Sequence, residues 1–395
     1  TTALLTAVVK WRNEKEKKKF QGVLLFDLSA AYDMLNRKLF IEKAKVCGIN
    51  GSALNWLQSY LTGRSQAVTI GEEQSSIMQL DDGTPQGSSC SCSLFALFVG
   101  DLGLWTGSCS LMAYADDTCI TVVADTIDEL REKLSVEGER ILEYFAKNKM
   151  VANAAKTGML VFRPTTSRTI QSQININLLG SIIHESKEQK VLGVIVQNDL
   201  KFTKHTEKVQ RDLQYATSIL HRLNKTLGKK ELRQIANGIF MSKLRYCLPV
   251  YGGGLLRTKE SESQSGLLQS LQVCQNDMLR ILTGNKRSAH IRVQDMLMET
   301  KMNSVNQILG YSMVIETWKA RNFNVPVLAS LFERERSDGR TLRSDTGSQV
   351  LASFNETFSR GAATLWNMSS HSLKSTNLLI IAKAEARKLA KSLPL

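Results

Sequence analysis

Tyr114-Ala115-Asp116-Asp117 lies between two apolar runs, residues 111–113 and 119–123. The runs predict two strands, with the acidic pair at the turn between them. Two adjacent carboxylates repel each other unless a cation lies between them. Successive side chains in a strand point to opposite faces, so both acids can face one cation only at a turn. The stretch is therefore either a solvated turn or a divalent-metal site.

A third acid, far upstream, favours the metal site. Residues 23–26 form an unbroken apolar run typical of a short buried strand, and Asp27 follows it directly. Taken alone, an acid here usually caps the next segment, and an acidic pair in a turn is usually only a turn. Together they could supply three carboxylates to one site. Mg²⁺ prefers a few such oxygen ligands, with substrate phosphates in its other positions.

Three segments resemble motifs A, B and C of reverse transcriptases, in the variant found in non-LTR (LINE-type) retrotransposons. They are residues 26–33 (FDLSAAYD), 83–88 (GTPQGS) and 114–118 (YADDT). Shorter pieces resemble the same family in the same order: residues 56–61 with Arg64, 153–157 (motif D) and 191–194 (motif E, the primer grip). The resemblance covers roughly residues 1–205, and a weaker one continues downstream.

The resemblance implies an α+β fold: a right-hand polymerase palm with partial fingers, followed by an all-helical thumb and C-terminal region. We expect the palm and partial fingers in residues 1–205, the thumb in 206–260, and a nucleic-acid-binding helical region in 261–395. The implied function is RNA-directed DNA polymerase, which extends a DNA primer on an RNA template by two-metal phosphoryl transfer. Its partners would be the RNA template, a DNA primer or target DNA, and dNTPs. Its cofactor would be two Mg²⁺ ions, for which Mn²⁺ could substitute.

The family pattern assigns roles to individual residues. Asp27, Asp116 and Asp117 would be the catalytic and metal-binding residues, with Asp27 binding both ions and Asp117 the less important of the adjacent pair. Leu192 and Gly193 would form the primer-grip turn, although without the family they are simply part of a core strand.

The nucleotide side of the site would come from four other residues. Tyr32 would pack under the sugar and exclude a 2′-hydroxyl, which makes DNA the product; otherwise it is a buried tyrosine whose hydroxyl finds a partner. Gln86 and Gly87 would lie beside the incoming nucleotide and the template base. Lys156 would act as a cation or proton donor near the leaving pyrophosphate, although a lysine before a strand is usually solvated.

Two other functions remain open from the sequence. The first is a nucleic-acid-binding fragment derived from a retroelement and unable to catalyse, which the shortened fingers favour. The second is an RNA-dependent RNA polymerase, against which Tyr32 argues. We interpret Asp33 as structural, either a cap or an ion-pair partner. Motif B continues with Cys90 and Cys92 in a segment where relatives often have apolar residues and a proline, which predicts altered local packing.

Composition agrees with a nucleic-acid partner. The 395 residues carry a formal net charge of +14, and a strongly basic protein favours a polyanion. Seven scattered cysteines without zinc-site spacing predict reduced thiols and an intracellular protein, in the nucleus or cytoplasm. No stretch approaches the eighteen apolar residues of a membrane span, and the amino end does not have the pattern of a signal peptide.

Periodicity and capping signals predict the local elements. Helices are expected over residues 1–12, 34–46, 53–61 (capped by Ser52) and 93–99, and strands over 68–70, 158–162 and 191–196. Residues 126–129 have the form of a capping box that opens a long amphipathic helix. Beyond about residue 200 the pattern is helical.

Overall fold

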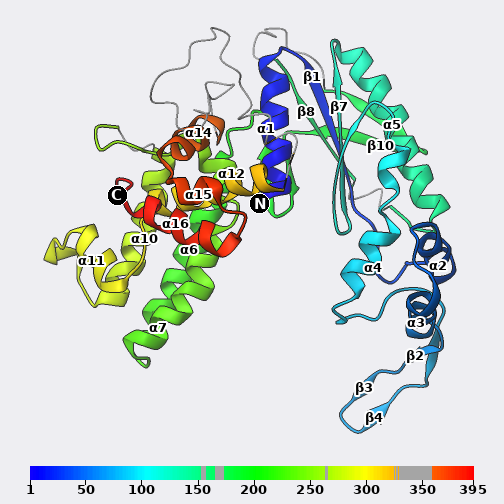
Figure 1. Cartoon of the computed structure of the whole chain (residues 1–395), viewed down its shortest axis with the longest axis horizontal. Helices are drawn as coiled ribbons and strands as arrows, with labels where there is room; N and C mark the ends of the chain where they lie inside the picture. Colours follow the sequence, from blue (N-terminus) through cyan, green and yellow to red (C-terminus); the bar gives the residue numbers. More distant parts are fainter. Residues whose placement is uncertain (153–156, 165–172, 263–265, 324, 326–327, 329–357) are drawn as a thin grey trace. The chain divides into compact units, whose positions relative to one another are not determined.

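The computed structural model describes residues 1–152, 157–164, 173–262, 266–323, 325, 328 and 358–395. It contains two compact units, one formed by Glu14–Leu192 and the other by Thr1–Asn13 with Gly193–Leu395. The first unit mixes helices with a sheet, and the described part of the second is mostly helical (Figure 1). The predicted α+β class is therefore confirmed.

A six-stranded sheet forms the centre of the first unit, in the order β6-β7-β1-β8-β10-β9 (Figure 1). β1 lies between β7 and β8 and is antiparallel to both, whereas β8 and β10 are parallel. The strands are β1 (Phe20–Phe26), β6 (Ser110–Tyr114), β7 (Asp117–Ala124), β8 (Gly158–Phe162), β9 (Asn175–Leu178) and β10 (Ser181–Ser186).

Helix α5 (Ile127–Lys147) covers one face of this sheet and packs on β1, β7 and β9. Its predicted apolar face is buried, including Leu134. Gly22 in β1 lets this helix pack closely, because a Cβ there would overlap the Leu134 side chain and force it to move. The Thr126 side chain accepts a hydrogen bond from the Glu129 backbone N–H, which confirms the Thr126 half of the predicted capping box. The Glu129 carboxylate accepts from the backbone N–H of Asp125, 2.9 Å away.

Apart from a short strand at Glu188–Val191, the remaining described elements of the first unit precede β6 in the sequence. Their helices α2, α3 and α4 carry buried apolar residues that belong to the same core as the sheet. Two small hairpins pair β2 with β5 and β3 with β4. The bounds are α2 (Arg37–Val46), α3 (Gly51–Leu61), β2 (Arg64–Gln66), β3 (Thr69–Ile70), β4 (Glu73–Gln74), β5 (Met78–Leu80), α4 (Ser91–Phe98) and the 3₁₀ turn η1 (Leu102–Trp105).

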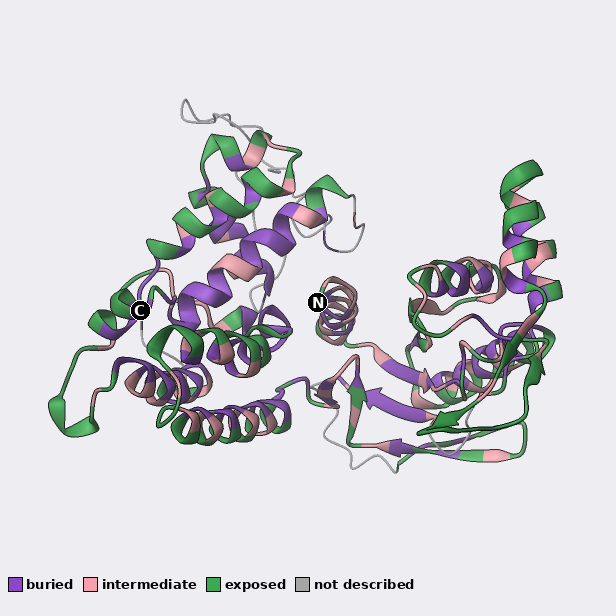
Figure 2. Ribbon diagram, turned by 90° about the horizontal axis from the view of Figure 1, so that it is seen from below, coloured by how far each residue is buried: buried purple, intermediate pink, exposed green. Residues whose placement is uncertain are grey.

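In the second unit, α10 packs against α6 and α11, and α12 packs against α14 and α16. Figure 2 shows buried residues on the packed sides of these helices and exposed residues on their outer sides. In the described part of this unit, and apart from the amino-terminal helix, the helices of six residues or more are α6 (Thr203–Leu223), α7 (Lys229–Ala236), α10 (Gly266–Thr283), α11 (Val293–Thr300), α12 (Val305–Asn322), α14 (Phe358–Met368) and α16 (Leu379–Lys391). The shorter elements are β12 (Val194–Gln197), η3 (Asn237–Met241), α8 (Ser242–Arg245), α9 (Leu248–Gly252), η4 (Gly253–Leu255), η5 (Arg287–Ala289) and α15 (His371–Ser375).

Helix α1 (Thr2–Glu16) is four residues longer at its carboxyl end than the helix predicted over residues 1–12. All seven cysteines are free thiols, as predicted. Within the described ranges, no helix has the length and apolar character needed to cross a membrane.

Two local predictions are wrong. Ser52 does not cap the third helix, which begins at Gly51 after Asn50. The single strand expected over 191–196 is two strands, β11 (Glu188–Val191) and β12, because Leu192 and Gly193 both adopt left-handed backbone conformations between them. An apolar run carries no signal of such a turn beyond its one glycine. The strands β9 and β10 were not predicted at all.

His205 in α6 makes the stability of the fold pH-dependent. Its buried ring packs edge-on against Tyr251, and Nδ1 accepts a hydrogen bond from the Ile195 N–H, 3.3 Å away. Burial lowers the pKa of His205 from 6.5 to about 4. Between these two pKa values the unfolded chain binds a proton that the folded chain does not. The free energy of unfolding should therefore fall by about 1.4 kcal/mol for each unit by which the pH is lowered in this range.

The variant His205→Asn is therefore expected to be less stable near neutral pH but less sensitive to acid between pH 6.5 and 4. Urea unfolding at several pH values would measure both effects. His221→Asn, at an exposed position on the same helix, is the matched control. An unchanged acid slope in His205→Asn would show that another group titrates in this range.

Candidate active site

The strand register brings the three predicted carboxylates to one end of the sheet. Phe26 at the end of β1 pairs with Thr118 of β7, so the next residue, Asp27, lies beside Asp117. Tyr114 pairs with Asp117 across the β6–β7 hairpin, which leaves Ala115 and Asp116 as a two-residue turn. Ala115 adopts the left-handed backbone region, at φ 54°, as the tight turn requires.

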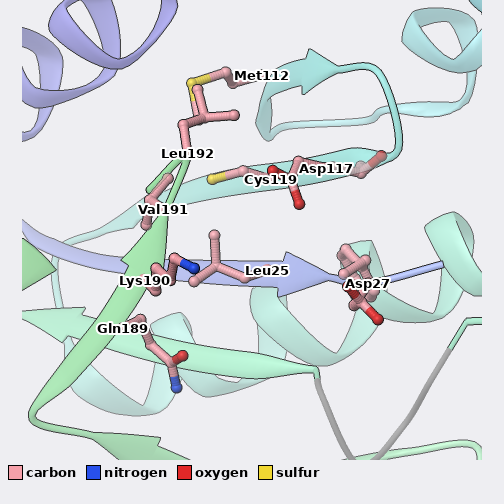
Figure 3. A pocket seen from close by; sticks show the side chains of 11 residues that line it. Leu25, Asp27, Met112, Asp117, Cys119, Gln189, Lys190, Val191 and Leu192 are labelled. Atoms are coloured by element: carbon pink, nitrogen blue, oxygen red, sulfur yellow. The ribbon is translucent and has the colours of Figure 1, made fainter. Parts of the chain in front are cut away.

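Asp27 and Asp117 line one pocket of about 240 Å³ (Figure 3). In Figure 3 Asp27 lies just beyond the end of β1 and Asp117 lies on the neighbouring β7. The opposite part of the wall comes from β11 and the residue after it, through Gln189, Lys190 and Leu192. The pocket thus places a segment predicted as the primer grip next to two of the predicted catalytic acids.

Burial and the neighbouring acids raise the pKa of Asp117. Burial is the main cause of a raised pKa at Asp117, followed by the charges of Asp116 and Asp27, while Lys190 acts in the opposite direction. The charges of Asp116 and Asp27 thus disfavour the ionised form of Asp117, and a bound cation would relieve this local excess of negative charge.

The donor set suits Mg²⁺ in its chemistry but is not a closed cage. Within the described ranges, no three acidic, histidine or cysteine side chains are grouped closely enough to hold one ion by themselves. Mg²⁺ is typically bound by one or two carboxylates, with water and substrate phosphates completing its octahedron. Asp27 and Asp117, which line the same pocket, therefore have the chemistry expected for an ion whose other ligands come from water and a phosphorylated substrate.

Tyr32 is half-buried against helix α4. Its ring lies 4.8 Å from the ring of Phe95, tilted by 35°, and its hydroxyl donates a hydrogen bond to Cys92 Sγ, 3.9 Å away. Burial, the contact with Cys92 and the charge of Asp116 together raise the pKa of Tyr32. The tyrosine is therefore within electrostatic reach of the carboxylates as well as in contact with motif B.

Gln86 connects motif B to motif A. Its amide nitrogen donates to both carboxylate oxygens of Asp33, at 2.8 and 3.1 Å. This contact of Asp33 is an amide hydrogen bond, not the cap or ion pair that was predicted. The next residue, Gly87, has φ 81°, and a Cβ there would meet only open space. Gly87 thus exposes its backbone, as close approach to a ligand requires.

The primer-grip residues form a turn. Leu192 has φ 46° and Gly193 has φ 81° between β11 and β12, and Leu192 lines the pocket with Asp27. Lys156, with the other motif D residues 153–155, lies outside the described residues.

Two contributors to the site were missed by the sequence analysis. Lys190 reaches the pocket from β11, and only its position two residues before the predicted grip could have indicated it. Arg37 is buried and donates from Nε to the carbonyl oxygen of Gly83, 2.8 Å away, so it fixes the start of motif B. A basic residue in an amphipathic helix gives no signal of such a contact.

Comparison with known proteins agrees with this geometry. Residues 3–196 match the family described as reverse transcriptase (RNA-dependent DNA polymerase). The chain carries a reverse transcriptase domain. The motifs predicted from the sequence lie within the matched residues, and the predicted recognition of a LINE-type reverse transcriptase is confirmed.

Two curated relatives are of the non-LTR kind. The RNA-directed DNA polymerase from mobile element jockey of Drosophila funebris is 26% identical over 282 residues, which are 68% of this chain and 29% of the relative. Its counterpart from Drosophila melanogaster is 24% identical over 60% of this chain and 26% of the relative. The chain thus spans less than a third of the length of these relatives. Among solved structures, apo telomerase from Candida tropicalis is similar over 84% of this chain and 57% of the telomerase chain, at 13% identity and a TM-score of 0.42.

The raised pKa of Asp117 gives a test of cation binding. The pKa of Asp117 is higher in the folded chain than its ordinary value of 3.8. Between 3.8 and the raised pKa, the metal-free folded chain therefore binds more protons than the unfolded chain, and its stability rises as the pH falls. A bound cation competes with that proton. Stabilisation by Mg²⁺, measured as a rise in Tm, should therefore be largest near neutral pH and disappear as pH falls through the raised pKa.

The variant Asp117→Asn should have a higher Tm than the native chain in the absence of metal at neutral pH, and a smaller rise in Tm on addition of Mg²⁺. Asp128→Asn, whose side chain is 81% exposed on α5, should leave both unchanged. An equal Mg²⁺ gain in all three proteins would place cation binding elsewhere.

Proposed function

We propose that this chain is an RNA-directed DNA polymerase that extends a DNA primer on an RNA template. The observation that carries the proposal is the β1–β7 register, which sets Asp27 beside Asp117 with Asp116 in the adjoining turn. Its substrates would be dNTPs, and its partners the RNA template and a DNA primer or target DNA. Residues 206–260 would serve as the thumb and 261–395 as a further nucleic-acid-binding region.

Asp27, Asp116 and Asp117 would hold two Mg²⁺ ions, with Asp27 shared and Asp117 the least important. The ions, when bound, would stabilise charge on the attacking and leaving oxygens of the phosphoryl transfer. The protein's task is then to position the reactants, since this reaction needs little covalent chemistry from side chains. Lys190 acts against burial and the neighbouring acids by lowering the pKa of Asp117, and so favours its ionised form.

Residues around the nucleotide would select it and align it. Tyr32 would lie under the sugar, where an added 2′-hydroxyl would clash with its ring. Gln86 and Gly87 would border the incoming base pair, with Gln86 fixed by its hydrogen bonds to Asp33. Lys156 would neutralise or protonate the leaving pyrophosphate.

Leu192 and Gly193 would present the turn that supports the primer end. The left-handed conformations of both residues favour this role, because they bend the chain tightly next to the pocket that Leu192 lines.

The net charge of +14 predicts binding to a polyanion that weakens steeply with salt, because phosphate contacts release counterions.

Mg²⁺-dependent extension of a DNA primer on an RNA template tests the function. Extension with dNTPs that is lost in Asp116→Ala would support the polymerase. RNA binding without extension in the native chain would instead favour a binding protein unable to catalyse. Extension with NTPs in preference to dNTPs would indicate an RNA polymerase.

A further inference from the structure

Tyr32 is held by two residues of the same helix. Cys92 and Phe95 are three positions apart in α4, so their side chains lie on one face of it. Phe95 is 1% exposed and forms a fixed wall against the Tyr32 ring, 4.8 Å between centroids. Cys92 is exposed and accepts the hydrogen bond from the Tyr32 hydroxyl.

The two contacts restrain different motions of the tyrosine. Packing on Phe95, at an interplanar angle of 35°, limits rotation of the Tyr32 ring about its side-chain bonds, because the buried Phe95 ring occupies the adjacent space. The hydrogen bond to sulfur fixes the position of the hydroxyl at the far end of the ring, although sulfur is a weak acceptor. The backbone carbonyl of Tyr32 is also fixed, since it accepts from the Thr84 N–H 2.9 Å away.

We propose that Cys92 is a specificity-determining residue that, with Phe95, positions Tyr32 to exclude the 2′-hydroxyl of a nucleotide. This inference rests on the proposed polymerase function and on Tyr32 as the residue that contacts the sugar. Cys92 itself does not touch the substrate and acts only through the orientation of Tyr32. Without the Cys92 sulfur, the Tyr32 ring moves more freely against Phe95 and excludes a ribonucleotide less effectively.

The test is a double-mutant cycle on sugar selection. The ratio of kcat/KM for a dNTP to that for the matching NTP is measured in the native chain, Cys92→Ala, Tyr32→Phe and the double variant. A neutral hydrogen bond corresponds to a change on the order of fivefold. We expect Cys92→Ala and Tyr32→Phe each to lower the ratio by about this factor, and the double variant to lower it no further.

A matched control is Cys47→Ala, which removes an exposed thiol at the end of α2 and should leave the ratio unchanged. The proposal is overturned if Cys92→Ala lowers kcat/KM equally for both nucleotides, because that is a structural effect. It is also overturned if Cys92→Ala lowers the ratio as much in the Tyr32→Phe background as in the native chain.

A second measurement does not depend on activity. With 3-fluorotyrosine at position 32, the ¹⁹F resonance should shift in Cys92→Ala and not in Cys47→Ala. A native chain that extends no primer but shows this shift would refute the polymerase function and leave the Cys92–Tyr32 contact established. An unshifted resonance in Cys92→Ala would refute the contact, and the proposal with it, whatever the activity.

Discussion

Asp27→Asn and Asp116→Asn are each expected to lower Mg²⁺-dependent primer extension by a factor of about a thousand or more. Each substitution keeps the size of the side chain but removes a negative charge from the end of the sheet where β1 and β7 meet. Loss of one ligand weakens the electrostatic stabilisation of the transferred phosphoryl group, which accounts for several kcal/mol of the barrier. Single-turnover extension on an RNA template measures the effect.

Asp117→Asn should reduce extension less than Asp116→Asn. Asp128→Asn is the control, since its carboxylate is exposed and lies away from the sheet end. Thermal unfolding of every variant would confirm that it folds. Extension retained to within tenfold in both Asp27→Asn and Asp116→Asn would contradict the assignment of these carboxylates as metal ligands.

Tyr32→Val is expected to relax the choice of sugar by about a hundredfold, judged by the dNTP to NTP ratio of kcat/KM. Valine removes the ring that packs on Phe95 and leaves space under the sugar, so NTP incorporation rises while dNTP incorporation changes much less. The buried Phe95 stays in place and should preserve the fold around it.

Tyr215→Val is the control for Tyr32→Val, because it removes an exposed tyrosine from α6. Extension with each of the four dNTPs and NTPs, at matched template positions, gives the ratio. Unchanged discrimination in Tyr32→Val would remove Tyr32 from the sugar site and would also remove the basis for a role of Cys92.

The elements that carry the carboxylates could be predicted from the sequence because their signals are local. An apolar run that ends just before Asp27 indicates a buried strand, and the two apolar runs on either side of Asp116 and Asp117 indicate a hairpin. The prediction that these distant segments meet in one site came from the family resemblance. The pairing of Phe26 with Thr118, which sets Asp27 beside Asp117, agrees with that prediction.

The contacts that hold the site together could not be predicted in this way. The hydrogen bonds from Gln86 to Asp33 and from Arg37 to Gly83 join segments that only tertiary packing brings together. Periodicity reports which face of an element is buried, not which polar groups meet there. The same limit hid Lys190, whose pocket-facing position depends on the turn at Leu192.

The most direct test of the central claim is to locate Mn²⁺ by anomalous X-ray scattering. The crystals would contain the chain with an RNA template, a dideoxy-terminated DNA primer and the matching dNTP. We predict two Mn²⁺ ions, with carboxylate oxygens of Asp27, Asp116 and Asp117 at about 2.0–2.2 Å, as for other hard divalent ions. Mn²⁺ bound elsewhere, with these three carboxylates free of metal, would contradict the account.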